Sequence, residues 1–150
     1  MLEFILYMEY RRGNHCIYHC EYHLIITTKY RRSIINEGLW AHLERKLLEI
    51  TEHYPDIYFK TRNHDKNHIH MQIVIPPTRS IGSVVGLIKA NTSRKIKEQF
   101  PFLKQVYWGI DGIWSDSYFV STSGIPPEIL TKYIENQGRE DEGQTAKLFE

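Results

Sequence analysis

Two histidines separated by one residue stand at the start of an apolar run, in the stretch NHIHMQIVIP at residues 67–76. If this run is a strand, successive side chains point to opposite faces, so His68 and His70 lie on one face, about 6.6 Å apart along the strand. Two imidazoles placed in this way can bind one metal ion. A histidine pair in a strand is also compatible with two half-buried polar residues, so the triplet by itself leaves both interpretations open.

A tyrosine and a glutamine lie four residues apart in the segment KYIENQ. If this segment is helical, Tyr133 and Gln137 share one face of the helix, next to an apolar stripe marked by Leu130 and Ile134. The simplest interpretation is that Tyr133 packs at the edge of the core and that Gln137 faces solvent. A chemical role for either residue depends on what else lies close to them.

Two groups of basic residues are candidates for binding nucleic acid. One follows the first predicted strand and the other lies on a predicted helix: Lys29, Arg31 and Arg32, and Lys89, Arg94 and Lys95. Charged helix faces are usually only solvated. Cations accompanied by aromatic residues such as Tyr30, Trp108, Trp114 and Tyr118 also suit a phosphate backbone and unstacked bases.

The pattern along the chain predicts the elements that position these residues. Alternation predicts a half-buried strand over residues 15–27, and strands over residues 56–62 and 68–75 form a hairpin around the polar turn NHDKN. Helical periodicity predicts one helix from the N-cap Asn36 to Tyr54 and a second from the N-cap Ser80 to Phe100, each followed by a proline. A strand at SYFVSTS and a helix at EILTKYIENQ complete the order.

This order, β-α-β-β-α-β followed by a C-terminal helix, predicts an α+β fold of the ferredoxin-like type. Two helices then cover one face of an antiparallel sheet, and the other face is free for a ligand or partner. The length of 150 residues fits a single domain over residues 1–150. We expect residues 1–12 to be an N-terminal leader and residues 138–150 to be a flexible tail.

Composition and cysteine spacing indicate a cytoplasmic protein. The chain is 41% hydrophobic and 25% charged and has no apolar stretch that could span a bilayer. The segment MLEFILY lacks the basic region and cleavage site of a signal peptide. Cys16 and Cys20 lie about 13 Å apart on an extended strand, too far for a disulfide, and have no other cysteine to pair with.

The net charge of +1 is unevenly distributed along the chain. Residues 128–150 carry three basic and six acidic residues, a net charge of −3, which leaves a net charge of +4 on residues 1–127. This excess of basic residues is small, so charge alone gives only weak support for a nucleic-acid partner.

Five blocks in order closely resemble the HUH single-tyrosine transposases of small insertion sequences, which move as single-stranded DNA. The blocks, which extend from Gly13 to Gln137, are GNHCIYHCEYHLIITTKYRR, NHIHMQIVIPP, GLIKANTSRKIKEQFP, GIWSDSYFVSTSG and KYIENQ. The resemblance implies that Tyr133 is the catalytic nucleophile, forming a 5′-phosphotyrosine, and that His68, His70 and Gln137 hold a divalent ion, Mg²⁺ or Mn²⁺. It also implies a homodimer with shared active sites that binds single-stranded DNA carrying subterminal hairpins.

The sequence departs from the family pattern at two places. Asn67 stands where an acidic residue is common, and the segment GIPPE precedes the tyrosine helix where a flexible, glycine-rich connection is usual. Two prolines restrict that hinge.

Three alternative functions share parts of the pattern. One is a nickase of the replication-initiator or relaxase type, and another is a domesticated, repeat-associated relative of the transposases. The third is a non-catalytic RNA-binding module with the same order of elements. The strand at residues 68–75 lacks the aromatic residues on which such a module stacks bases.

Overall fold

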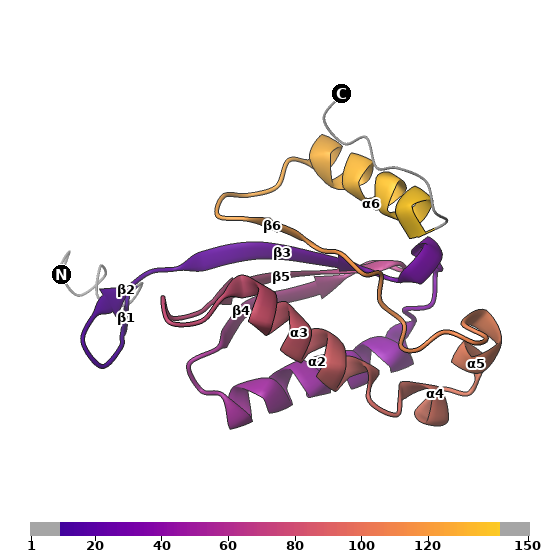
Figure 1. Ribbon diagram of the computed structural model, residues 1–150, viewed down its shortest axis with the longest axis horizontal. Coiled ribbons are helices and arrows are strands. Elements are labelled where there is room, and N and C mark those ends of the chain that lie inside the picture. Colours follow the sequence, from indigo (N-terminus) through magenta and orange to yellow (C-terminus); the bar gives the residue numbers. More distant parts are fainter. Residues whose placement is uncertain (1–9, 142–150) are drawn as a thin grey trace.

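The computed structural model describes residues 10–141, and its central feature is a four-stranded antiparallel sheet (Figure 1). The sheet order is β4-β5-β3-β6. Along the chain the main elements are β3 (Glu21–Thr27), α2 (Glu37–His53), β4 (Tyr58–His64), β5 (His68–Val74), α3 (Ile81–Ser93), β6 (Phe119–Ser121) and α6 (Pro127–Asp141). The predicted order β-α-β-β-α-β with a C-terminal helix is confirmed.

Helix α2 begins and ends where the sequence places its signals. The side chain of Asn36 accepts a hydrogen bond of 2.8 Å from the backbone N–H of Leu39, which satisfies one of the free donors of the first turn. The apolar residues at helical spacing, Leu39, Leu43, Leu47 and Ile50, are almost completely buried. The helix therefore packs on the sheet through the face that its periodicity predicts.

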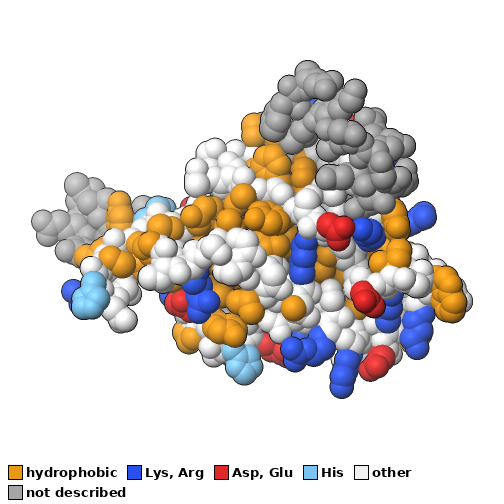
Figure 2. Space-filling view, in the orientation of Figure 1, with side chains coloured by type: hydrophobic (Ala, Val, Ile, Leu, Met, Phe, Trp, Pro, Cys, Tyr) orange, Lys and Arg blue, Asp and Glu red, His pale blue; other side chains and the backbone are white. Residues whose placement is uncertain are grey.

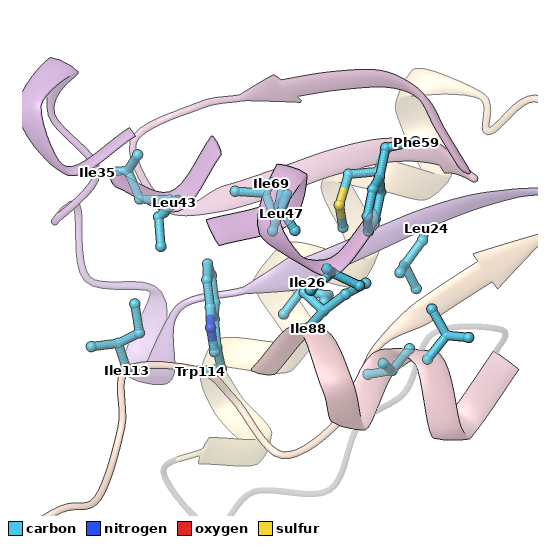
Figure 3. Close-up of a cluster of buried hydrophobic side chains, with 14 of the residues drawn as sticks. Leu24, Ile26, Ile35, Leu43, Leu47, Phe59, Ile69, Ile88, Ile113 and Trp114 are labelled. Carbon is cyan, nitrogen blue, oxygen red and sulfur yellow. The ribbon is translucent and has the colours of Figure 1, made fainter. Parts of the chain in front are cut away.

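The main hydrophobic core lies between the sheet and the helices α2 and α3. Strands β3 and β5 contribute Leu24, Ile26 and Ile69, which Figure 3 shows close to Leu47 of α2 and Ile88 of α3. All five side chains are 0% exposed. The odd-numbered residues of β5 therefore face this core, so its even-numbered residues, which include both histidines, face the opposite side.

That opposite side, called the histidine face below, is formed by residues 21, 23, 25 and 27 of β3 and residues 68, 70 and 72 of β5 with the β6 residues paired to them. Figure 1 shows α6 lying over it, on the other side of the sheet from α2 and α3. Ile25, on this face, is completely buried, and Tyr133 of α6 packs against Phe119. The prediction that this face is free is therefore wrong for the part that α6 covers.

The first predicted strand, residues 15–27, is divided in the structure. Its first part, β2 (Ile17–Tyr18), pairs with β1 (Arg11–Arg12) in a separate two-stranded sheet, and only residues 21–27 join the main sheet. The two-stranded sheet is closed by a turn in which the N–H of Gly13 donates to the carbonyl of Cys16 at 2.8 Å. The leader was predicted to cover residues 1–12, but its last two residues, Arg11 and Arg12, form strand β1. Residues 1–9 lie outside the described residues.

The predicted helix at residues 80–100 is also divided. Ser80 caps α3 as expected, but the helix ends at Ser93, and Lys95 takes a left-handed conformation with φ of 55° before α4 (Ile96–Gln99). A further short helix, α5 (Phe102–Val106), lies in the connection to β6. Ile96, the first residue of α4, is nevertheless buried in the hydrophobic core as predicted.

The ends of two other elements differ from the prediction. Strand β4 is shifted to residues 58–64, and the register of its pairing with β5 changes between Phe59 and Thr61. Helix α6 extends beyond Gln137 to Asp141, so the predicted tail begins later, and residues 142–150 lie outside the described residues. Within residues 10–141, no helix is both long and apolar enough to cross a membrane.

Candidate active site on the histidine face

His68 and His70 lie on the histidine face of β5 with the β3 strand beside them. The backbone pairing places His68 opposite Thr27 and His70 opposite Ile25. Residues paired directly across two antiparallel strands have side chains on the same face. The prediction that both imidazoles point to one side is therefore confirmed.

The ring nitrogens of the two histidines suit a metal ion. The Nδ1 of His68 lies 2.9 Å from the side-chain oxygen of Asn67 and donates to it in the tautomer that carries its proton on Nδ1, which leaves Nε2 with a lone pair for an ion. The Nε2 of His70 is buried and has no hydrogen-bond partner. A buried nitrogen without a partner is explained if a ligand supplies one. Asn67 can thus orient the imidazole of His68 although it is not acidic.

Burial favours the neutral form of both imidazoles by lowering the pKa of each. Desolvation is the largest cause lowering the pKa of His68, and Asp65 opposes it only in part. Desolvation also lowers the pKa of His70, and the neighbouring His23 lowers it further. Because a metal binds the unprotonated nitrogen, these lowered pKa values favour metal binding near neutral pH.

The lowered pKa values predict that the metal-free protein loses stability in mild acid. Unfolded histidines take up protons near pH 6.5, whereas His68 and His70 do so in the folded state only at lower pH. The unfolded state therefore binds more protons below pH 6.5, and the free energy of unfolding falls as the pH drops from about 7 to 5. Urea unfolding at several pH values measures this.

His42 contributes in the same direction, because burial also lowers its pKa. Replacing both His68 and His70 with Asn should reduce the pH dependence but leave the part due to His42. A double variant whose stability depends on pH as strongly as that of the original chain would contradict this assignment.

Tyr133 and Gln137 lie on the buried side of α6, one helical turn apart. Tyr133 is 7% exposed, and its ring meets Phe119 edge to face with 5.3 Å between centroids. The hydroxyl of Tyr133 lies 3.4 Å from that of Ser117. The interpretation of Tyr133 as a residue packed at the edge of the core is therefore confirmed, whereas the expected solvation of Gln137, which is 2% exposed, is wrong.

The side chain of Gln137 is held by two serines that precede β6. Its Nε2 donates to the hydroxyl of Ser115 at 2.5 Å, and its Oε1 accepts from the hydroxyl of Ser117. Ser115 is itself tied to β3, because its N–H donates to the carbonyl of Thr27 at 2.9 Å. Gln137 is thus anchored beside Thr27, the residue that pairs with His68.

Tyr133 contacts the strand residue that lies across β3 from His70. Phe119, which Tyr133 contacts, pairs with Ile25, and Ile25 pairs with His70. Two strand spacings therefore separate Phe119 from His70, about 10 Å. The structure brings the tyrosine and the histidine pair onto one face, with strand β3 between them.

Ser115, Ser117 and Phe119 are neighbours of the candidate site that the sequence pattern did not predict. All three are in SDSYF, which directly precedes or begins β6. Their contact with α6 depends on the pairing of β6 with β3, which is not visible in the local pattern. The block GIWSDSYFVSTSG, which resembles the transposases, was the one signal that pointed to them.

The basic candidates divide into two kinds. Arg31 and Arg32 are exposed and belong to the turn next to β3, where the short helix η1 (Lys29–Arg31) packs against α6. Lys29 in the same turn lies 3.5 Å from Asp116. Tyr30 and Arg31 have left-handed backbones with φ of 58° and 53°, a strained conformation that is common near functional sites.

The prediction that Lys89 faces solvent is wrong, because its ammonium group binds backbone carbonyls. Its Nζ donates to the carbonyls of Ser115 at 2.7 Å and Ser117 at 3.2 Å, so it holds the segment before β6. Arg94 and Lys95 are exposed. Figure 2 shows Lys and Arg side chains, with acidic ones among them, toward the lower right of the visible face, where Figure 1 places α4 and α5.

The chain resembles known transposases over most of its length. The family model described as "Transposase IS200 like" matches residues 16–137. The transposase for insertion sequence element IS200 of Salmonella typhimurium is 31% identical over 130 residues, 85% of this chain and 82% of that protein. The ISDra2 transposase TnpA of Deinococcus radiodurans is 29% identical over 134 residues, covering 89% of this chain and 94% of that protein.

Solved structures share the fold. A crystal structure of a candidate transposase from Deinococcus radiodurans has a TM-score of 0.71 and 28% identity, over 85% of this chain and 97% of that one. A REP-associated tyrosine transposase bound to a REP hairpin has a TM-score of 0.53 at 14% identity, over 93% of this chain and 77% of that one. With the histidine pair and the tyrosine helix on one face of the sheet, these matches show that the chain belongs to the IS200-like family of HUH single-tyrosine transposases.

Proposed function

We propose that this transposase cleaves and rejoins single-stranded DNA at the ends of an insertion sequence, through a 5′-phosphotyrosine formed on Tyr133. One observation carries the proposal: His68 and His70 face the same side of the sheet on which α6 presents Tyr133. The chain's membership of the IS200-like family supports the same reaction. Its two free cysteines suit a reducing, cytoplasmic compartment.

His68, His70 and Gln137 would hold a divalent ion, Mg²⁺ or Mn²⁺. Imidazole ligands fit Mn²⁺ somewhat better than the harder Mg²⁺, and an amide oxygen suits both. When bound, the ion would withdraw negative charge from the scissile phosphate. The Oε1 of Gln137 accepts from the hydroxyl of Ser117, and its second lone pair would serve the ion.

Tyr133 would supply the attacking oxygen. Its ring is fixed against Phe119, and its hydroxyl points toward Ser117, so the side chain is ordered before DNA arrives. As the bond from the tyrosine oxygen to phosphorus forms, the bond from phosphorus to the 3′ oxygen breaks, and the tyrosine proton passes to solvent or a nearby base. A 3′-hydroxyl can later reverse the reaction on another 5′ end, which permits strand transfer without ATP.

The DNA partner would be single-stranded DNA with subterminal hairpins. A neighbour of the same fold is described as bound to a REP hairpin, which supports a hairpin ligand. The exposed Arg31 and Arg32, beside α6, offer cations for the phosphate backbone close to the candidate site, and Arg94 and Lys95 offer a second group.

Arg31 and Lys89 should respond differently to substitution. Replacing Arg31 and Arg32 with Ala removes exposed cations, so the slope of log affinity for DNA against log salt should fall by about 1 to 2, with little change in stability. Lys89→Met leaves two carbonyls without their donor, so the free energy of unfolding should fall by about 1–3 kcal/mol with the salt slope unchanged. Fluorescence titrations at several salt concentrations and urea unfolding measure both. A Lys89 variant with a reduced salt slope would contradict its structural role.

We further propose a homodimer whose active sites are shared between subunits. In the single chain α6 packs on its own sheet, so sharing would require α6 to take the same place on the sheet of the partner subunit. Pro127 is the first residue of α6, where its missing N–H costs nothing. Pro127 therefore starts the helix, and residues 122–126, of which 122–124 are exposed, connect it to β6.

Mixing two inactive variants distinguishes shared from separate sites. A Tyr133→Phe chain and a chain with His68→Ala each lack one part of the site. If α6 serves the partner's histidines, the mixed dimer contains one site with both parts, and cleavage should return to about a quarter to a half of the original rate. No recovery, with mixed dimers shown by native mass spectrometry, would contradict sharing.

A cleavage assay tests the proposed function itself. The purified chain should cleave single-stranded DNA from the end of its own element in the presence of Mn²⁺ or Mg²⁺, remain attached to the 5′ side, and join that end to another 3′-hydroxyl. Duplex DNA of the same sequence is the control and should remain intact. Cleavage without joining would favour the nickase alternative, and no cleavage of any single strand would contradict the proposal.

A further inference from the structure

A third histidine, His23, lies on the histidine face between the histidine pair and the tyrosine helix. It belongs to β3, where it pairs with Gln72 of β5 on one side and Ser121 of β6 on the other. Its ring is tilted against that of His70, with 5.9 Å between the centroids. Any group that contacts both an ion at His70 and the hydroxyl of Tyr133 must cross strand β3.

A chain of hydrogen bonds fixes which nitrogen of His23 carries the proton. The backbone N–H of Gln72 donates to the hydroxyl oxygen of Thr61 at 3.2 Å, and that hydroxyl donates to the Oε1 of Gln72 at 2.9 Å. The amide nitrogen of Gln72 is thereby directed to the Nε2 of His23, at 3.5 Å. Since Nε2 accepts, the proton of the neutral imidazole is on Nδ1.

The Nδ1 of His23 is buried and has no partner. Leaving such a donor unsatisfied is unfavourable, so a ligand that brings an acceptor to it would be stabilised there. Among the described residues, buried side-chain atoms with neither a hydrogen bond nor an ion pair gather on this face: those of His23, Thr27 and His70 lie there, and that of His42 lies elsewhere. The carboxylate of Glu21 is engaged by Lys60 at 3.0 Å.

The missing partner is an acceptor. A neutral imidazole with its proton on Nδ1 presents an N–H there, which cannot coordinate a cation but donates to an anionic oxygen. The neighbouring polar group of β3, the hydroxyl of Thr27, lies four residues along the strand, about 13 Å away, so it cannot serve the same acceptor. His23 is therefore the side chain of β3 that can donate a hydrogen bond to an acceptor beside His70.

We propose that His23 is a catalytic residue that donates a hydrogen bond from Nδ1 to a non-bridging oxygen of the scissile phosphate. This inference rests on the proposed function. During attack by Tyr133 negative charge on that oxygen grows, so the bond strengthens in the transition state. His23 transfers no proton: the tyrosine proton leaves to solvent, and the departing 3′ oxygen takes one from solvent.

Asparagine and glutamine substitutions test the position of the donor. The amide nitrogen of Asn can occupy the place of Nδ1, whereas that of Gln reaches the place of Nε2. We expect His23→Asn to cleave within about tenfold of the original rate, and His23→Gln and His23→Phe to lose about 100-fold or more in single-turnover experiments. Equal rates for the Asn and Gln variants, or an unchanged rate in the Phe variant, would overturn the proposal.

Measuring metal affinity distinguishes a His23 that donates a hydrogen bond to phosphate from a His23 that binds the metal ion. Titration of the DNA-free protein with Mn²⁺, followed by electron paramagnetic resonance, should give affinities within about threefold for the original chain and the three His23 variants. A loss of Mn²⁺ affinity of tenfold or more in all three, with circular dichroism showing folded protein, would overturn the assignment of His23 as a phosphate donor.

A binding experiment does not depend on cleavage. In a Tyr133→Phe background, replacing the scissile phosphate with a neutral methylphosphonate should weaken binding of the DNA strand severalfold when His23 is present and leave it unchanged when His23 is Phe. Equal weakening in both proteins would overturn the proposal. If this coupling is found but the original chain forms no adduct, the phosphate contact stands and the proposed reaction fails.

Discussion

Replacing Tyr133 with phenylalanine will abolish covalent attachment of the protein to DNA. The substitution removes only the hydroxyl and keeps the ring that packs against Phe119, so folding and DNA binding should remain. Because no other group replaces the attacking oxygen, we expect the rate of adduct formation to fall by a factor on the order of 10⁴ or more. Denaturing gels with a labelled single strand measure the adduct.

Tyr54→Phe is the matched control, since Tyr54 is exposed at the end of α2, away from the histidine face. It should form the adduct at the original rate. An adduct of normal yield in the Tyr133 variant would show that another side chain is the nucleophile.

Replacing His68 and His70 together with alanine will abolish cleavage while DNA binding survives. Both side chains face the side of the sheet where the tyrosine helix lies, and the unpartnered Nε2 of His70 is available to an ion. Without the two imidazoles proposed to hold the ion, the charge on the phosphate would lose its stabilisation, so we expect a loss of about 10³-fold or more. Single-turnover cleavage with Mn²⁺ and calorimetric titration of Mn²⁺ measure the two effects.

His53→Ala provides the control for the histidine pair. His53 is an exposed histidine in the last turn of α2 and should bind neither ion nor DNA at this site. If the double variant at residues 68 and 70 binds Mn²⁺ as tightly as the original chain, the metal site lies elsewhere.

The local patterns of the sequence predicted most of the sheet and the histidine pair. The alternation of β5 is clear because its odd-numbered residues enter the core and its even-numbered residues do not, so the common face of His68 and His70 follows from the period alone. Asn36 and the apolar spacing after it likewise defined α2. These features depend on neighbours within one or two turns or strands.

Features that depend on distant contacts were not predictable in this way. Lys89 looks like a solvated cation in its helix, but the segment that carries Ser115 and Ser117 returns beside it and takes its hydrogen bonds. The break at Lys95 has no glycine to mark its left-handed backbone. The position of α6 on the histidine face rests on contacts with η1, with the two serines that precede β6, and with Phe119 at the start of β6.

The two departures from the family pattern have physical explanations in the structure. Asn67 contacts the Nδ1 of His68 through its side-chain oxygen, so an uncharged residue can fix the tautomer of that imidazole. Pro127 occupies the first position of α6, where proline is favoured. Neither departure removes a group that the proposed reaction needs.

Locating the covalent bond between protein and DNA tests the proposed reaction most directly. The adduct formed with Mn²⁺ is trimmed with nuclease, digested with protease and sequenced by mass spectrometry. We expect the remaining nucleotide to be joined through its 5′ phosphate to the peptide that contains Tyr133, on the tyrosine oxygen. Attachment at any other residue, such as Tyr30 or Tyr118, or through a 3′ phosphate, would contradict the proposed reaction.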